Sequence, residues 1–133
     1  MRPLAALAAC LCACASLPGN DGLETPFAPA GDAQRGREAF AAREHGHCVL
    51  CHAAPGVAVA GNVGPSMAGI ASRLTPAQIR LRIADITKVY PDSVMPTFHR
   101  TAGMTRVAPQ YRGKPALTGQ EVEDIVAWLS TLK

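Results

Sequence analysis

The pentapeptide Cys48-Val49-Leu50-Cys51-His52 constrains the fold of this chain more than any other stretch. Two thiols at this spacing can each add to one vinyl group of a single porphyrin, and the His after the second Cys is then held where its imidazole can bind the iron. The motif therefore predicts one covalent haem c, with Cys48 and Cys51 as attachment residues and His52 as an axial ligand.

Two other kinds of site also use a Cys-x-x-Cys pair. Zinc sites need two more ligands, and a chain cleaved after its leader has no Cys besides Cys48 and Cys51. Redox-active thiol pairs of the thioredoxin type need a βαβ context, and the sequence shows almost no strand-like alternation. Both alternatives are weaker than haem attachment.

The first residues have the composition of an export signal. Arg2 provides a positive start, and the apolar run over 4–17 is too short to span a bilayer. The small residues Ala13-Cys14-Ala15 fit a cleavage site, and lipid attachment at Cys14 or Cys10 is the alternative. Since haem c is assembled on the far side of the bacterial membrane, the export signal and the attachment motif both predict a periplasmic protein.

The predicted organisation is a signal peptide over 1–15, a flexible arm over 16–30 and one folded domain over 31–133. The net charge of +3 at pH 7 is mild, and no basic-aromatic patch accompanies it, so nucleic-acid binding is not favoured. A domain of this size is marginally stable on its own core, and a buried porphyrin would add apolar volume.

Hydrophobic periodicity predicts an all-α fold. The first helix should begin after Asp32, which can cap it, and end before Gly46, with Gly36 and Phe40 on its inner face. Gly36 is costly within a helix, so it marks either a close approach by another helix or a tolerated surface position.

Two further helices begin with capping boxes. Thr75 with Gln78 starts one and Thr118 with Glu121 starts the other. The inward-facing residues predicted from the 3.6-residue period are Ile79, Ile83, Ile86 and Tyr90 in the first of these, with Arg82, Asp85 and Lys88 toward water, and Val122, Ile125, Val126, Leu129 and Leu132 in the last helix. Residues 66–72 are expected to form a short helix, residues 92–117 an irregular stretch, and Trp128 should pack against the first helix or the haem edge.

The second axial ligand has to come from elsewhere in the chain. We predict Met95, because Pro96 stiffens the backbone beside it and a thioether opposite an imidazole raises the reduction potential relative to two imidazoles. Met104, in the same irregular stretch, is the next candidate. The remaining candidates are Met67, His45, His47 and His99. The Pro65 carbonyl is a candidate acceptor for the Nδ1 proton of His52, and a plain turn is the alternative for this segment.

Together these features resemble class I cytochrome c. The resemblance covers residues from about 31 to the end and rests on Gly36 and Phe40, the attachment motif, Gly64-Pro65, a loop Met and the Trp128-Leu129 pair. It implies N- and C-terminal helices that cross around one covalently bound haem, here with a long loop before the last helix.

A narrower resemblance is to SoxX, the small monohaem subunit of SoxAX complexes. It rests on Gly61-Asn62-Val63-Gly64-Pro65-Ser66-Met67, Val94-Met95-Pro96-Thr97-Phe98, Arg106-Val107-Ala108-Pro109-Gln110-Tyr111-Arg112-Gly113-Lys114-Pro115 and the tail from Leu117 to Leu129. In that family the Cys-x-x-Cys-His residues and a Met hold the haem, which correspond here to Cys48, Cys51, His52 and Met95.

The resemblance to SoxX also implies partners and a reaction. The complex is an L-cysteine S-thiosulfotransferase, which joins thiosulfate oxidatively to a cysteine of the SoxYZ carrier at a site on the larger haem subunit, SoxA. The SoxX haem takes up the electrons and passes them to a diffusible cytochrome c. The alternatives are an independent periplasmic electron shuttle for an oxidase or dehydrogenase, and a ligand-binding haem protein with an open iron site.

Overall fold

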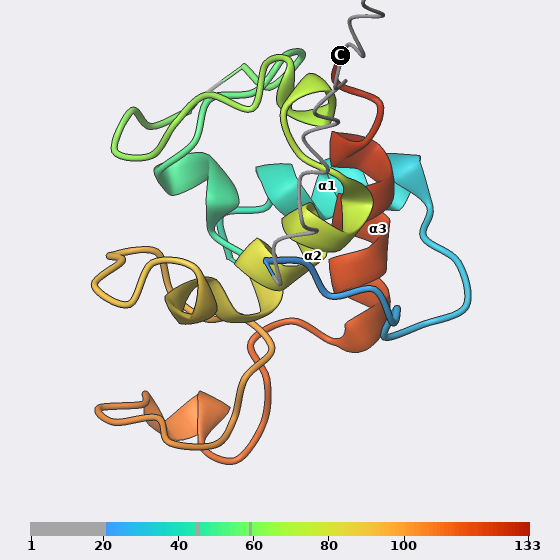
Figure 1. Ribbon diagram of the computed structural model, residues 1–133. Coiled ribbons are helices and arrows are strands. Elements are labelled where there is room, and N and C mark those ends of the chain that lie inside the picture. The colour runs from blue at the N-terminus through green and yellow to red at the C-terminus, as the bar shows by residue number, and fades with distance from the viewer. Residues whose placement is uncertain (1–20, 45, 59) are drawn as a thin grey trace, which may run out of the picture.

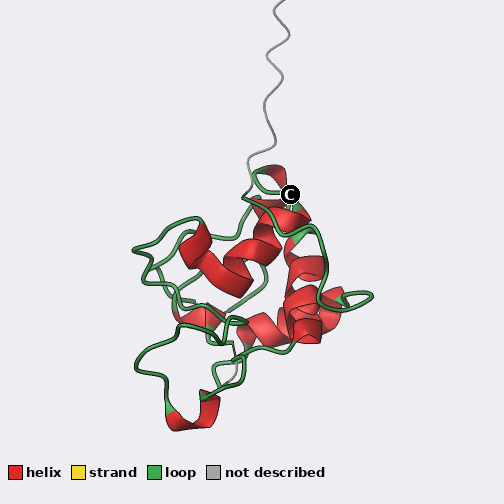
Figure 2. Cartoon of the chain, turned by 60° about the horizontal axis from the view of Figure 1, so that its bottom comes forward, coloured by secondary structure: helices red, strands yellow, loops and turns green. Residues whose placement is uncertain are grey.

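The computed structural model describes residues 21–44, 46–58 and 60–133. Its elements are the helices α1 (Ala33–Ala41), α2 (Pro76–Asp85) and α3 (Gly119–Leu129) and the short 3₁₀ helices η1 (Cys48–Leu50), η2 (Ile70–Ser72), η3 (Ile86–Lys88) and η4 (Pro109–Tyr111). Figures 1 and 2 show these helices joined by long loops, and the described residues contain no strand. The all-α prediction is confirmed.

The predicted leader, residues 1–15, lies outside the described residues. Among those described, no helix has both the length and the apolar character needed to cross a membrane.

Helices α1 and α3 cross in close contact, as predicted. A Cβ at Gly36 would overlap the carbonyl group of Asp124 and lie 2.9 Å from the backbone nitrogen of Ile125. One turn further along α1, the Phe40 ring packs on the Trp128 ring with centroids 4.9 Å apart. Gly36 therefore marks a helix crossing rather than a tolerated surface position.

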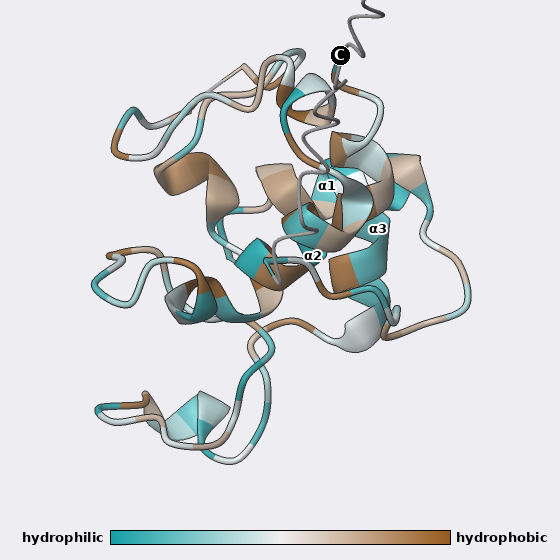
Figure 3. Ribbon diagram, in the orientation of Figure 1, coloured by the Kyte–Doolittle hydropathy of each residue, from teal (hydrophilic) through white to brown (hydrophobic). Residues whose placement is uncertain are grey.

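Both predicted capping boxes are present. The Thr75 side chain accepts from the Gln78 backbone while the Gln78 side chain accepts from Thr75, and Thr118 and Glu121 make the same pair of bonds at the start of α3. The inner faces of the helices then meet in one apolar core, which includes Phe40, Ile79, Ile83, Leu117, Val122, Ile125 and Leu129. Figure 3 shows hydrophobic residues in brown on the ribbons of α2 and α3.

Helix α2 is shorter than the sequence period indicated. It ends at Asp85, and the chain continues as the 3₁₀ turn η3, whose period is three residues rather than 3.6. Tyr90, predicted to face inward, is therefore 58% exposed. Asp85, predicted to face water, is buried, where its carboxylate accepts from Thr87 and pairs with Arg100. The predicted helix over 66–72 is reduced to η2.

The segment 21–31, part of the predicted flexible arm, has no helix or strand but lies along α2 and α3 (Figure 1). Leu23 N–H donates to the Ala77 carbonyl at 2.9 Å, and Phe27 N–H donates to Glu123 at 3.0 Å. These hydrogen bonds join residues far apart in the sequence, so hydrophobic periodicity could not predict them.

Two adjacent carboxylates of α3 hold the other elements in place. Glu123 accepts from Arg80 of α2 at 2.7 and 2.8 Å and from Phe27 N–H. Asp124 accepts from Arg35 of α1 at 2.8 and 3.0 Å and from Asp32 N–H at 2.7 Å. This pair, Glu123 and Asp124, is called the α3 clasp below.

The clasp carboxylates are held ionised by their partners. Burial opposes ionisation of Glu123, but the hydrogen bonds from Arg80 and Phe27 outweigh it and lower the pKa. For Asp124 the hydrogen bond from Arg35 is the largest influence, and the pKa is again lowered. A lowered carboxyl pKa in the folded state means that the ionised form stabilises the fold.

The first prediction concerns the helix crossing. Replacing Gly by Ala within a helix ordinarily stabilises it, but Gly36→Ala should destabilise this protein by about 2 kcal/mol because the new methyl overlaps the α3 backbone. Urea denaturation of the haem-loaded protein measures this, with exposed Gln34→Ala on the same helix as the control. A stability equal to or above that of the wild type would show that α1 and α3 do not approach so closely.

The second prediction concerns the clasp. The stability that the two carboxylates contribute is present above their ordinary pKa values and is lost as pH falls through the lowered, folded-state values, so unfolding free energy should drop below about pH 4. Glu123→Gln leaves the Arg80 charge buried without its partner and should lower the unfolding free energy by about 3 kcal/mol at neutral pH. As the pH is lowered further, the unfolding free energy of this variant should fall less than that of the wild type. Urea denaturation across pH checks both, with exposed Asp92→Asn as the control. Identical pH profiles for the wild type, Glu123→Gln and Asp92→Asn would show that the clasp does not cause the loss of stability in acid.

Candidate functional site

The site is built on the tight coil between α1 and the loop that follows it. His47 has a left-handed backbone, φ 56°, which turns the chain into η1. Cys51 N–H and His52 N–H then both donate to the Cys48 carbonyl, at 3.1 and 2.9 Å. Cys48, Cys51 and His52 therefore all belong to one short coil.

His52 is oriented by a backbone carbonyl. Its Nδ1 lies 2.7 Å from the Pro65 oxygen. Because a carbonyl only accepts, the proton is on Nδ1, and Nε2 keeps the lone pair that a metal requires. The predicted role of the Pro65 carbonyl is confirmed.

Gly64 allows this arrangement because it has no side chain. A Cβ there would overlap the His52 imidazole, with Nδ1 at 2.6 Å and Nε2 at 2.8 Å. The backbone at Gly64 is tied to the motif as well, since its N–H donates to the Cys51 carbonyl at 2.8 Å. The loop therefore lies flat against one side of the His52 ring.

The two thiols are free, and Cys48 lacks the environment of a redox-active one. Burial raises the pKa of Cys48 to about 11, and its Sγ lies 3.7 Å from the Gly46 carbonyl. Redox-active thiols have a lowered pKa instead. Within the described residues no group of three or more His, Cys, Asp or Glu side chains gathers as a metal site.

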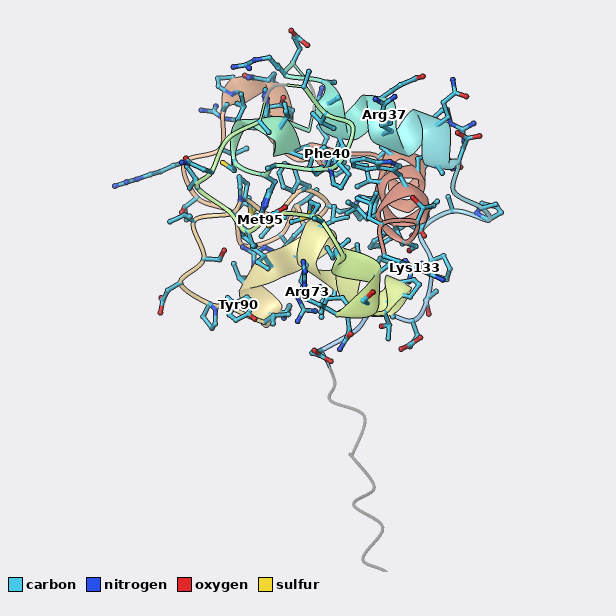
Figure 4. All side chains as sticks on the ribbon, turned by 90° about the horizontal axis from the view of Figure 1, so that it is seen from above. Arg37, Phe40, Arg73, Tyr90, Met95 and Lys133 are labelled. Carbon is cyan, nitrogen blue, oxygen red and sulfur yellow. The ribbon has the colours of Figure 1, made fainter. Side chains whose placement is uncertain are left out.

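Met95 lies in the loop that follows η3, far from the attachment coil in the sequence. It is half-buried against the core, and its N–H donates to Ser93 Oγ at 3.1 Å. In Figure 4 Met95 lies toward the middle of the molecule, whereas Tyr90 projects at the edge. Val94, the neighbour of Met95, is 87% exposed, whereas Phe98 is buried.

The other candidate Met residues have different surroundings. Met67 is part of the buried core, and its N–H donates to the Ala53 carbonyl. The sulfur of Met104 accepts from Thr97 Oγ1 at 3.2 Å and from Arg100 at 3.4 Å. Met104 is therefore engaged in a polar contact with its own loop.

The candidate His residues lie in different parts of the structure. His47 is exposed, and His45 lies outside the described residues. The His99 ring packs on Phe27 with centroids 4.1 Å apart, and its Nδ1 lies 2.9 Å from the Leu117 carbonyl. Its position is thus set by the N-terminal segment and the start of α3.

Sequence reasoning missed the polar group that holds the Met95 loop to α2. Arg100 reaches Asp85 at 3.3 Å and Thr87 at 3.0 Å, and it also donates to Met104. The sequence offers no signal for this group, because the helical period predicts that Asp85 faces water, whereas it is buried in the structure. These contacts join residues 13 and 15 positions apart across a turn.

The residues present fit a covalently bound haem. Two free thiols and an imidazole leave one coil, the imidazole proton is fixed on the nitrogen away from the metal-binding one, and Gly64 provides a flat surface behind the ring. These groups offer two sites for thioether formation and a nitrogen ligand for iron.

Comparison with known proteins agrees with this chemistry. The Cytochrome c family model matches residues 33–133. A chain in the crystal structure of SoxXA from P. pantotrophus superposes with a TM-score of 0.77 at 30% sequence identity, and the match covers 85% of this chain and 90% of that one. A search of curated protein sequences gives no match.

The match to the family model includes all three helices, the attachment coil and the Met95 loop. Family membership also establishes the cofactor that the motif predicted, haem c. The chain belongs to the cytochrome c family and is a SoxX-like member of it.

Proposed function

We propose that the chain is the electron-transfer subunit of a complex that oxidatively joins thiosulfate to a carrier cysteine. The observation that carries this proposal is the likeness to a SoxXA chain over 85% of this sequence at 30% identity. The partners we propose are a SoxA-like larger haem subunit, the SoxYZ carrier and a diffusible cytochrome c that accepts the electrons.

Four residues would hold the haem. Cys48 and Cys51 would form the two thioether bonds, and His52 would bind the iron through Nε2, because the Pro65 carbonyl holds its proton on Nδ1. The bound haem supplies a one-electron couple between ferric and ferrous iron. Met95 is the ligand we propose on the opposite face, since its thioether favours the ferrous state and is half-buried against the core.

The polar contacts of Met104 favour Met95 over it. The Met104 sulfur already accepts two hydrogen bonds, and moving it to the iron would leave the Thr97 hydroxyl and an Arg100 donor without this acceptor. No such contact holds the Met95 sulfur among the described residues.

The location and processing follow from the same proposal. We propose cleavage of a signal peptide over 1–15, which leaves residues 16–30 as an N-terminal arm and residues 31–133 as a periplasmic domain. Lipid attachment at Cys14 or Cys10 is the alternative form of the mature chain.

The third prediction tests the axial ligand. Met95→Ala should keep the haem covalently attached, lose the absorption band of the thioether–iron bond, lower the reduction potential and admit carbon monoxide, because one face of the iron opens. Absorption spectra and redox titration measure these changes. Met104→Ala is the matched control and should keep the band. If the band persisted without Met95 and vanished without Met104, the assignment would have to be exchanged.

The fourth prediction tests the function. When the chain is coexpressed with the SoxA and SoxYZ proteins of its own organism, it should copurify with SoxA, and thiosulfate should reduce its haem only when SoxA and SoxYZ are both present. Light scattering and stopped-flow absorbance measure the two effects. A monomer that exchanges electrons rapidly with an oxidase, and does not bind SoxA, would instead indicate an independent electron shuttle.

A further inference from the structure

Residues 99–116 form a lobe that projects from the body of the protein (Figures 1 and 2). Its two ends are closed by the Leu117 N–H, which donates to the Phe98 carbonyl at 2.9 Å, and by the His99 ring on the Leu117 carbonyl. A loop whose ends are bonded together in this way is a defined structural unit, and such units are frequently functional.

The lobe has no core of its own. None of the residues from 99 to 116 is buried, and the 3₁₀ helix η4 within it contains no buried residue either. Val107 and Tyr111 are half-exposed, although both are apolar enough to pack. Together with the lining of the hollow described below, they form an apolar surface that a second molecule could cover.

The charge of the lobe has one sign. From residue 93 to residue 120 the sequence holds Arg100, Arg106, Arg112 and Lys114 and no Asp or Glu. Arg100 is neutralised by Asp85, while the structure places no described carboxylate within salt-bridge distance of the other three. All three are exposed, so the lobe presents three unpaired cations.

A hollow is lined mainly by residues of the lobe and reaches the neighbours of the haem-attachment motif and of Met95. It has a volume of about 250 Å³, and its lining includes Val107, Tyr111, Arg106 and Lys114 from the lobe. Its other side is lined by His47 and Pro96, the neighbours of Cys48 and Met95. Arg106 has a left-handed backbone, φ 56°, a conformation that costs free energy and is concentrated at functional sites.

We propose that this lobe is a docking surface for an acidic face of the haem-bearing partner subunit, with carboxylates of the partner on Arg106, Arg112 and Lys114 and apolar side chains in the hollow. The proposal rests on the proposed function, because it names the surface through which the two subunits meet. Docking there places the partner beside the attachment coil, so that electrons cross a short distance.

The charge argues for this occupant over two others. A second copy of the chain would bring the same three cations against one another, which is repulsive. An anionic lipid surface would accept the cations but gains little from a lobe whose apolar residues line a hollow rather than project from it.

The experiment measures association of the haem-loaded chain with the SoxA subunit of the same organism. The test variant carries Arg106→Glu, Arg112→Glu and Lys114→Glu, and a second carries Gln at the same positions. Lys133→Glu is the control for a charge reversal outside the lobe, because this exposed cation lies at the C-terminus, at the opposite end of the molecule (Figure 1), and each lobe position is also reversed singly for comparison with it. Spectra and urea denaturation establish that each protein is folded around its haem.

We expect the Kd to rise by about tenfold or more for the Glu variant and less for the Gln variant, with Lys133→Glu close to wild type. The dependence of the wild-type Kd on ionic strength should flatten in both lobe variants, because the unpaired cations are the source of that dependence.

Wild-type binding together with equal Kd values for the lobe variants and the control would overturn the docking proposal and leave the proposed function standing. Failure of the wild type to bind SoxA would overturn both. Self-association of the wild type, or sedimentation with anionic phospholipid vesicles that the lobe variants lose while SoxA binding is unchanged, would assign the lobe to another occupant and overturn the proposal.

Discussion

The close crossing of α1 on α3 is the contact on which the other parts depend. It exists because Gly36 has no side chain, so the two backbones meet at Asp124. Phe40 and Trp128 then pack against each other across the crossing, with their ring planes tilted by 58°. Since the attachment coil η1 begins only a few residues after α1, the position of α1 on α3 also sets where the two thiols and His52 lie.

The α3 clasp extends this frame with electrostatics. The middle of α3 supplies two adjacent carboxylates, and each binds one cation of another helix and one backbone N–H, from Phe27 for Glu123 and from Asp32 for Asp124. Buried ion pairs gain little unless all hydrogen bonds are made. Here Glu123 makes its bonds to Arg80 and Phe27, which explains how charged groups are tolerated beside the apolar core.

The site itself is carried by loops held against that frame. The Pro65 carbonyl orients His52 from one side, and the loop with Met95 lies across the core and is held to α2 by Arg100 and Asp85. Loops held by such specific contacts can present ligands without regular secondary structure. The lobe after this loop has no comparable internal packing, which separates the part that holds the haem from the part that we propose meets a partner.

The sequence by itself determined the cofactor, the three helices and their caps, because attachment spacing, capping boxes and helical period are local patterns. For the Pro65 carbonyl and for Gly36 it left two alternatives open, and the structure decided for the hydrogen bond to His52 and for the helix crossing. Only the tertiary structure decided that Asp85 is buried and Tyr90 exposed, since the chain changes from α to 3₁₀ geometry after residue 85. It likewise decided the partners of Glu123 and the closed lobe, because these contacts join residues distant in sequence and leave no periodic signal.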